Sequence, residues 1–475
     1  MLLANSFSGS GSRDGKSPQP PFQGGVNQSI RELALQILLR VNTGRGRARE
    51  ILDTTIQSQG IVDPDKSLMT ELVYGTIRWR GNLDWVIGTF IKHRKLKKLR
   101  PAVVEILRLG LYQLLFLDSV PDHAAVNESV EMSKRYKGMS GLVNAVLRSA
   151  ARNRDSIAYP DIQTDPVGHI AARYSHPEWL VKRWVERYGV DETIQLCIAN
   201  NTRAPLFVRT NILKTSRDNL LQSLQEDGAE ASASRNLPES IEILNLPLPI
   251  NRLTAYNQGW FQVQDESSML ASHILDPQPG ETIIDACAAP GGKSTHIAEL
   301  MGNKGSVLAL DVDLRRLRLA VESARRLGIT ILEAMEVDAR ELSEQKADRV
   351  LVDAPCTGLG VLRRRVEARW RRTPDELKTF PELQYELLSS AARHVKSGGV
   401  LVYCTCTIEP EENQQVVERF LRENQEFRIQ NALPFLPAEL RERQSESLVT
   451  AEGYMQTYPH IHNMDGFFAA RMTRI

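Results

Sequence analysis

Apolar residues in the first third of the chain recur at helical spacing. Beginning at Ile30 they fall on one face of a helix, and further amphipathic stretches follow at 66–74, 82–91, 102–117, 126–135 and 142–151. Pro101 stands where a helix would begin, and Gly75 and Gly138 stand where helices would end. Because no strand pattern interrupts these stretches, residues 26–155 are predicted to form an all-helical domain.

The pattern changes on both sides of this domain. Residues 1–25 are rich in Ser, Gly, Pro and Gln and have no periodicity, so they are predicted to be a disordered extension. Residues 156–175 contain Pro and Asp and are predicted to be a linker. Residues 176–261 combine an amphipathic helix at 176–189 with strand-like pieces at 206–210 and 241–244, which indicates a small α+β segment.

Strands and helices alternate over the remaining residues, 262–475. Short apolar runs predict strands at 282–288, 306–312, 331–339, 348–355 and 398–406. Amphipathic stretches predict helices between them, as at 313–327 and 381–395. This alternation is typical of an α/β fold with a doubly wound parallel sheet, in which ligands bind at the carboxyl ends of the strands.

Composition narrows the class of protein. The 475 residues are 42% hydrophobic and 25% charged, which is typical of a globular protein with packed cores. No run approaches the roughly 18 apolar residues that span a bilayer, and the N-terminus lacks the basic start of a signal peptide. The five cysteines are too few and too scattered for a disulfide scaffold, so we expect free thiols in a cytoplasmic protein.

The net charge of +1 does not by itself indicate a nucleic-acid-binding protein, but basic residues are concentrated locally. One basic run covers 92–100. A second places six arginines and Trp370 within 363–372. Charge runs are usually solvated surfaces, yet arginines interleaved with an aromatic residue beside a candidate site favour contact with phosphates and stacked bases.

A glycine-containing motif follows the first of the C-terminal strands. Residues 285–293 read DACAAPGGK and lead into a helix at 294–300. Gly291 and Gly292 allow a ligand to approach the backbone closely, and the start of the helix offers free N–H groups. The motif is not G-x-G-x-x-G, so it fits a dinucleotide pyrophosphate poorly. A simple strand-to-helix turn is the alternative interpretation.

Acidic residues end the next strands. Asp311 closes the second strand, where a carboxylate suits ribose hydroxyls. The alternative is a helix cap, but Asp313 is better placed to cap the helix that begins at Leu314. Asp338 ends the third strand and is a candidate for the edge of an adenine ring.

Two thiols follow the last two predicted strands. Asp353 and Cys356 lie in the loop DAPCTGLG, and Cys406 lies in YCTCT, which also contains Cys404. Zinc is disfavoured here because paired C-x-x-C ligands and nearby histidines are missing, and a disulfide is disfavoured in a cytoplasmic protein. Nucleophilic chemistry is the favoured interpretation, because a thiolate can add to an electron-poor ring carbon.

The motifs at 285–293, 353–356 and 405–407 together resemble the RNA cytosine-5 methyltransferases of the Sun/Fmu type. The helical part resembles the NusB RNA-binding domain, notably at 120–138 and 141–152. This combination is the arrangement of the bacterial 16S ribosomal RNA methyltransferases of the Fmu/Sun (RsmB) type. The resemblance implies a Rossmann-like methyltransferase domain at 262–475, a NusB-like RNA-binding domain at 26–155 and a small RNA-binding segment at 176–261.

The resemblance also implies the cofactor, S-adenosylmethionine, and assigns roles to residues. It implies that Asp311 binds the ribose, Asp338 the adenine edge, and that Asp353 lies between the cofactor and the target base. It makes Cys406 the nucleophile and Cys356 the residue that assists release. The loop expected to hold the methionine and ribose portions is Cys287, Ala288, Ala289, Pro290, Gly291, Gly292 and Lys293.

The implied substrate is a specific cytosine in 16S ribosomal RNA, either free or in an early assembly state, and the protein is expected to be a monomer without membrane contact or a catalytic metal. Three alternatives stay open. A nicotinamide-dependent dehydrogenase would share the sheet but would require G-x-G-x-x-G. A non-catalytic RNA-binding factor would use only the helical domain. The same chemistry on transfer RNA is compatible with the catalytic motifs.

Overall fold

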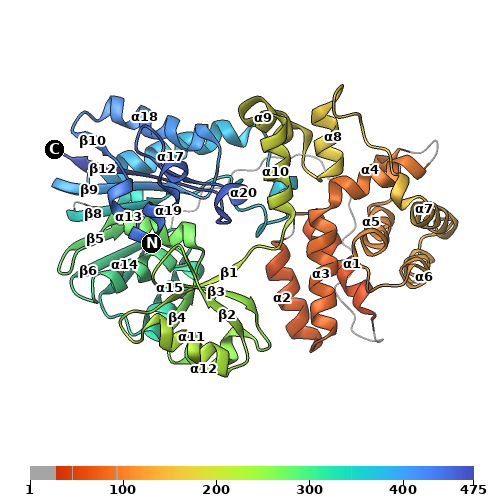
Figure 1. The fold of residues 1–475 in the computed structure, drawn as a ribbon, viewed down its shortest axis with the longest axis horizontal. Coiled ribbons are helices and arrows are strands. Elements are labelled where there is room, and N and C mark those ends of the chain that lie inside the picture. Colours follow the sequence, from red (N-terminus) through yellow and green to blue (C-terminus); the bar gives the residue numbers. More distant parts are fainter. Residues whose placement is uncertain (1–27, 45, 92–94, 344) are drawn as a thin grey trace, which may run out of the picture.

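The computed structural model describes residues 28–475, apart from residues 45, 92–94 and 344. Figure 1 shows a helical body, drawn in red to yellow, beside a larger body built on strands. The predicted disordered extension, 1–25, lies outside the described residues, as does the beginning of the first basic run. In the part that is described, no helix is both long and apolar enough to cross a lipid bilayer.

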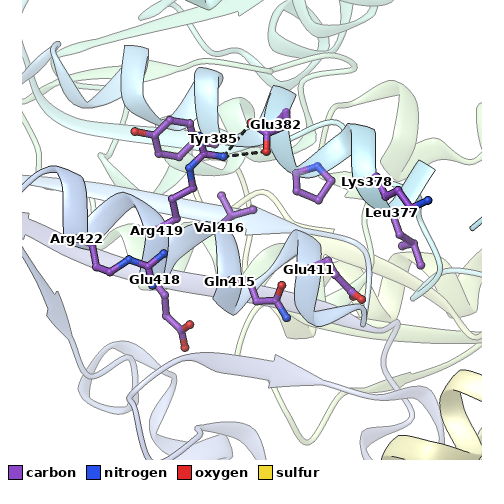
Figure 2. Close-up of a pocket in the computed structure, with 11 residues that line it drawn as sticks. Leu377, Lys378, Glu382, Tyr385, Glu411, Gln415, Val416, Glu418, Arg419 and Arg422 are labelled. Atoms are coloured by element: carbon purple, nitrogen blue, oxygen red, sulfur yellow. Dashed lines mark hydrogen bonds and ion pairs between the residues drawn. The ribbon is translucent and has the colours of Figure 1, made fainter. Parts of the chain in front are cut away.

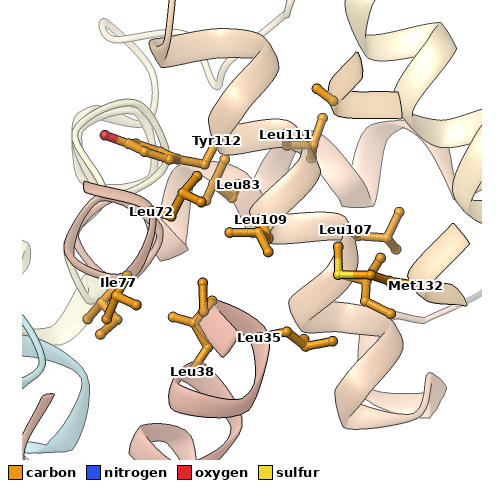
Figure 3. Close-up of a cluster of buried hydrophobic side chains, with 14 of the residues drawn as sticks. Leu35, Leu38, Leu72, Ile77, Leu83, Leu107, Leu109, Leu111, Tyr112 and Met132 are labelled. Carbon is orange, nitrogen blue, oxygen red and sulfur yellow. The ribbon is translucent and has the colours of Figure 1, made fainter. Parts of the chain in front are cut away.

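The N-terminal body is a bundle of helices. They are α1 (Ile30–Asn42), α2 (Ala48–Gln59), α3 (Asp65–Arg78), α4 (Arg80–Phe90), α5 (Pro101–Phe116), α6 (Asp122–Ser133) and α7 (Ser140–Arg152). Helix α5 is buried over most of its length, and Figure 3 shows Leu38, Leu72 and Leu109 from three helices meeting in the core. The predicted helical architecture is confirmed. The sequence pattern missed α2, which buries only residues of its first two turns.

Gly75 does not end a helix, contrary to the sequence-based expectation. It lies inside α3, where a Cβ atom would stand 1.9 Å from Cζ of Tyr112 on α5. The glycine is therefore explained by the close approach of a tyrosine ring to the α3 backbone. Pro101 is the first residue of α5, as predicted.

Three helices connect this bundle to the sheets. They are α8 (Pro166–Arg173), α9 (Glu178–Tyr188) and α10 (Val190–Asn201). Helix α8 lies within the predicted linker, and its start is defined by Asp165, which accepts a hydrogen bond from the Gly168 N–H, and by Pro166 in the first turn. Trp184 of α9 packs with Leu359 of the C-terminal domain. These helices therefore also pack against the C-terminal domain.

A four-stranded antiparallel sheet follows, in the order β2-β3-β1-β4. Its elements are β1 (Leu206–Thr210), α11 (Arg217–Glu226), β2 (Glu230–Ala233), β3 (Ser240–Asn245), α12 (Thr254–Asn257) and β4 (Phe261–Val263). The strands predicted at 206–210 and 241–244 are confirmed as β1 and β3. This small sheet ends with β4, two residues beyond the domain boundary expected from the sequence.

The large sheet has eight strands, of which seven lie in the order β10-β12-β9-β8-β5-β6-β7 while β11 pairs with β12. The strands are β5 (Thr282–Asp285), β6 (Ser306–Asp311), β7 (Leu332–Glu336), β8 (Ala347–Asp353), β9 (Val395–Thr405), β10 (Phe427–Gln430), β11 (Met455–Thr457) and β12 (Phe467–Arg474). The five predicted strands, β5 to β9, form a parallel sheet. The last three strands are antiparallel to their neighbours, so the sheet is mixed. Strand β12 was missed because six consecutive residues are buried, which leaves no alternation to detect.

Helices cover both faces of this sheet. They are α13 (Glu266–Leu275), α14 (Gly292–Leu300) and α15 (Leu314–Leu327) on one face and α17 (Glu376–Ala392) and α18 (Gln414–Glu423) on the other. The alternation of β9 produces the two cores, because Val402 and Cys404 face the first set of helices whereas Leu401 and Tyr403 face the second. Helices α16 (Ala368–Arg371), α19 (Ala438–Leu448) and α20 (Pro459–His462) lie in the connections. The predicted α/β class is confirmed.

The strand order reverses between β5 and β8. From β5 the chain adds β6 and β7 on one side, then returns to add β8 and β9 on the other. The loops that leave β5 and β8 therefore diverge and open a crevice at the carboxyl ends of the strands. Asp285 ends β5, Asp311 ends β6 and Asp353 ends β8, so the predicted acidic residues all lie at this edge.

Candidate active site

The loop between β5 and α14 packs tightly onto the neighbouring helix α15. Gly291 has φ +96°, and a Cβ atom there would stand 2.3 Å from Cβ of Ala320. The N–H of Gly291 donates to the Ala288 carbonyl over 2.7 Å, and the N–H of Ala288 donates to the Leu310 carbonyl over 2.8 Å. Asp285, which ends β5, is buried, and this burial raises its pKa to about 7 although the Ser294 hydroxyl donates to it. The backbone of this loop is therefore held in one conformation.

A cavity of about 390 Å³ lies beside this loop, and it brings three of the predicted cofactor residues together. Cys287, Asp311 and Asp338 all line it. Asp311 accepts hydrogen bonds from the Ala289 N–H at 3.0 Å and the Asp313 N–H at 2.9 Å. Asp313 itself caps α15, as expected from the sequence. The volume of this cavity and its two carboxylates on adjacent strand ends fit a nucleoside cofactor.

Asp338, the candidate for the adenine edge, is hydrogen-bonded to a neighbouring arginine of the protein. Its carboxylate accepts hydrogen bonds from the Arg340 backbone and side chain, and the guanidinium of Arg340 also bonds Glu386. The hydrogen bonds from the Arg340 side chain lower the pKa of Asp338. Asp338 is therefore an ionised acceptor at the rim of the cavity.

Asp311→Asn should weaken cofactor binding by roughly 10- to 100-fold, since the variant loses a charged acceptor for hydroxyl groups. Isothermal titration of the purified protein with S-adenosylhomocysteine measures this directly. Asp348→Asn is the matched control, because Asp348 lies near the opposite end of β8, where it bonds Thr282 and Lys396. Unchanged affinity in the Asp311 variant would contradict the assignment.

Lys293 does not point to the nucleoside cavity but to Asp353. Its Nζ donates to Asp353 Oδ2 over 2.7 Å. The Lys293 side chain is largely buried, whereas that of Asp353 is 32% exposed. Burial alone would lower the pKa of Lys293, but the adjacent Asp353 carboxylate raises it, so the ammonium ion is retained. Cys404 Sγ lies 3.6 Å from the other oxygen, Oδ1. The Lys293–Asp353 pair was not predicted, because the two residues are 60 positions apart.

The two predicted thiols meet at the same edge. Cys356 follows β8, Cys406 follows β9, and their sulfur atoms lie 3.3 Å apart. Their hydrogen bond lowers the pKa of the Cys406 thiol, and the guanidinium of Arg365 lowers it further. The same hydrogen bond and burial raise the pKa of Cys356. These opposite shifts favour Cys406 as the thiolate of the pair.

Buried polar groups hold the two thiol loops together. Glu412 accepts from the Thr357 N–H over 2.8 Å and from Gln384 over 3.0 Å. The Gly360 N–H donates to the Cys406 carbonyl over 3.1 Å, so one loop is bonded directly to the other. Glu412 is not among the site residues predicted from the sequence. In the structure it fixes the Cys356 loop, a role that only the fold reveals.

The second basic run has a different role from the predicted one. Arg369 is fully buried and donates to the backbone carbonyls of Ser175 and Asn200, while Trp370 Nε1 donates to the Ile77 carbonyl over 2.7 Å. Most of the other arginines also bond groups of the protein, namely Arg363, Arg364, Arg371 and Arg372. These residues join the helical bundle to the catalytic loops. Arg369 is therefore not available for phosphate contacts, whereas Arg371 is exposed although it bonds the protein. Arg365 alone of the run is exposed without such a bond among the described residues.

A separate groove of about 430 Å³ lies between α17 and α18 (Figure 2). It contains none of the predicted site residues. Arg419 points across it to Glu382, which it bonds at 2.8 Å, and its guanidinium lies 3.8 Å from the ring centre of Tyr385. Arg419 is therefore held by groups of the groove itself.

Comparison with known proteins agrees with this geometry. Residues 272–473 match the family described as 16S rRNA methyltransferase RsmB/F, residues 28–152 match the NusB family, and residues 176–251 match the ferredoxin-like domain of RsmF/B-like methyltransferases. The chain is 38% identical over 452 residues to a probable ribosomal RNA small subunit methyltransferase B of Bacillus subtilis, covering 94% of this chain and 99% of the relative. The chain belongs to the RsmB/F family of 16S rRNA methyltransferases.

Solved structures share this fold. The crystal structure of the protein PH0851 superposes with a TM-score of 0.76 at 31% identity, covering 94% of this chain and 99% of that one. NSun6 from Pyrococcus horikoshii, solved with the S-adenosylmethionine analogue SFG, gives a TM-score of 0.55 at 26% identity, covering 63% and 98%. The predicted family and cofactor are therefore confirmed: this RsmB/F member is an rRNA methyltransferase that uses S-adenosylmethionine.

Proposed function

We propose that this RsmB/F member methylates carbon 5 of a specific cytosine in 16S rRNA through a covalent bond between Cys406 and carbon 6 of the ring. The observation that supports this most strongly is the pair of thiols 3.3 Å apart, beside Asp353 and next to the cavity lined by Asp311. A methyltransferase acting on nitrogen or oxygen atoms of RNA would have no use for a thiolate of lowered pKa at this edge.

The first step uses the Cys406 thiolate. Carbon 5 of cytosine is a poor nucleophile until a group adds at carbon 6. The sulfur of Cys406 forms a bond to carbon 6, and the ring electrons move towards carbon 5 and N3. Asp353 passes a proton to N3 as negative charge develops there and takes it back on release, and the Lys293 ammonium, bonded to the same carboxyl group, stabilises the carboxylate formed in between.

Methyl transfer and release follow at the same edge of the sheet. Bound S-adenosylmethionine supplies the methyl group, and carbon 5 takes it. A base then removes the carbon 5 proton, the electrons restore the double bond between carbons 5 and 6, and the bond from carbon 6 to Cys406 breaks. Cys356 lies within hydrogen-bond distance of the departing sulfur, so it stabilises the thiolate as it leaves.

The target base must be unstacked to admit a thiolate at carbon 6, which suits a loop or a flipped nucleotide. The NusB match at 28–152 and the ferredoxin-like match at 176–251 support the proposal that residues 26–155 and 176–261 bind the RNA around it. We propose that the protein acts as a cytoplasmic monomer on free or early-assembly rRNA.

Methyl transfer from radiolabelled S-adenosylmethionine tests this function. The acceptors are 16S rRNA transcribed in vitro and, in parallel, unmodified transfer RNA. We expect the label in rRNA and, after nuclease digestion, in 5-methylcytidine. Label in another nucleoside would overturn the chemistry, and label only in transfer RNA would overturn the substrate.

A further inference from the structure

A cluster of two histidines and one glutamate lies at the junction between the small sheet and the large one. Glu239 directly precedes β3, His273 lies on α13 and His296 lies on α14. Arg209 of β1 bonds Glu299 of α14, which places the small sheet against this helix. The cluster is separate from the thiols and the cofactor cavity, since it shares no lining residue with the latter.

The three side chains converge. His273 Nε2 lies 2.7 Å from Glu239 Oε1, and His296 Nε2 lies 3.4 Å from the same oxygen. One ligand atom from each residue falls within 4.8 Å of those from the other two. Together they line a cavity of about 200 Å³. A small inward movement would place all three atoms at the distances of about 2.0–2.2 Å at which nitrogen and oxygen bind zinc.

The position of the carboxylate in the cluster suits a cation. Nε2 of each histidine ring lies near the same oxygen of Glu239, and that side chain is buried. Nearby Arg209 does not neutralise Glu239, because its guanidinium is bonded to both oxygens of Glu299.

One ring nitrogen of His296 lacks a hydrogen-bond partner among the described residues. The side chain is 1% exposed, and the nitrogen without a partner among those residues is Nδ1. With Nε2 directed at Glu239, one nitrogen of a fully buried ring stays unsatisfied, which is costly in an ordinary packing histidine. An ion that binds Nδ1 would supply the partner that this nitrogen lacks.

We propose that Glu239, His273 and His296 bind a divalent transition-metal ion, with zinc the best match to two imidazoles and one carboxylate. Three protein ligands leave a fourth position that opens on the cavity. Because the ligands come from the small sheet, α13 and α14, the ion joins the small sheet to the helix that follows the cofactor loop. The site is independent of the catalytic proposal.

The first measurement uses the full-length protein. It is stripped with chelator, loaded with zinc chloride, dialysed, and its metal content is measured by mass spectrometry. We expect about one ion per chain in wild type and less than about a tenth of that in His273→Gln and His296→Gln. His394→Gln is the matched control, because His394 is a buried histidine of the same domain outside the cluster. It should retain the ion.

The five free thiols are the main competing ligands, and cobalt separates them from the cluster. Cobalt bound by imidazoles and a carboxylate gives visible absorption without a thiolate charge-transfer band. Wild type and Cys356→Ser/Cys406→Ser should therefore give the same spectrum. A thiolate band, absence of retained metal, or retention unchanged by both histidine substitutions would overturn the proposal, and the last two would leave a plain His–Glu hydrogen-bond cluster. The cobalt spectrum of wild type decides the question if the histidine variants do not fold.

Discussion

Cys406→Ala should abolish methyl transfer, lowering the rate by on the order of 10⁴-fold or more, the scale of loss expected when a nucleophile is removed from an enzyme. The alanine variant retains the cofactor cavity, because Cys406 is not among the residues that line it. Binding of S-adenosylhomocysteine should therefore be almost unchanged. The measurements are transfer of radiolabel to 16S rRNA and calorimetric titration of the same preparation.

Cys197→Ala is the matched control for this substitution. Cys197 is a buried thiol on α10, within the core formed with Trp184, and it takes no part in the proposed chemistry. It should retain activity. Turnover of the Cys406 variant at the wild-type rate would remove the nucleophile assignment while leaving the family intact.

Cys356→Ser should trap the covalent complex between protein and RNA. Serine keeps a hydrogen-bond donor beside Cys406, so addition to carbon 6 continues, but the hydroxyl replaces the thiol that assists departure of the sulfur. We expect a protein–RNA species that survives denaturing electrophoresis, and product release slowed by roughly 100-fold or more.

The double variant Cys356→Ser/Cys406→Ala identifies the bond in this complex. The trapped species should disappear, because the sulfur that bonds carbon 6 is gone. An adduct that persists in the double variant would show that another nucleophile forms it. Absence of any adduct in the single variant would contradict the release role of Cys356.

Local patterns predicted much of the fold, because an element that is buried on one face has apolar residues at periodic spacing. The helices of the N-terminal bundle and strands β5 to β9 follow this rule. Elements that are buried on all sides, or scarcely buried, lack this spacing, which is why β12 and α2 were not predicted. Gly75 shows another limit: its conformation is helical, and its cause is a tyrosine ring from a distant helix.

The candidate site divides in the same way. Asp311, Asp353, Cys356 and Cys406 were found because each follows a recognisable strand, and strand ends gather at one edge of a parallel sheet. The binding of Lys293 to Asp353 was not found, nor was the contact of Glu412 with Thr357. These pairs depend on which loops the strand order brings together.

The sequence by itself determined the family and the α/β class and predicted the candidate thiols, because these depend on residue types at fixed local spacing. Only the tertiary structure decided which charged side chains bond other groups of the protein. The arginines of 363–372 have the composition of an RNA-binding surface, yet Arg369 is buried against the Ser175 and Asn200 carbonyls. A guanidinium can donate to a phosphate or to a backbone carbonyl, and packing between segments far apart in the chain sets which partner it has.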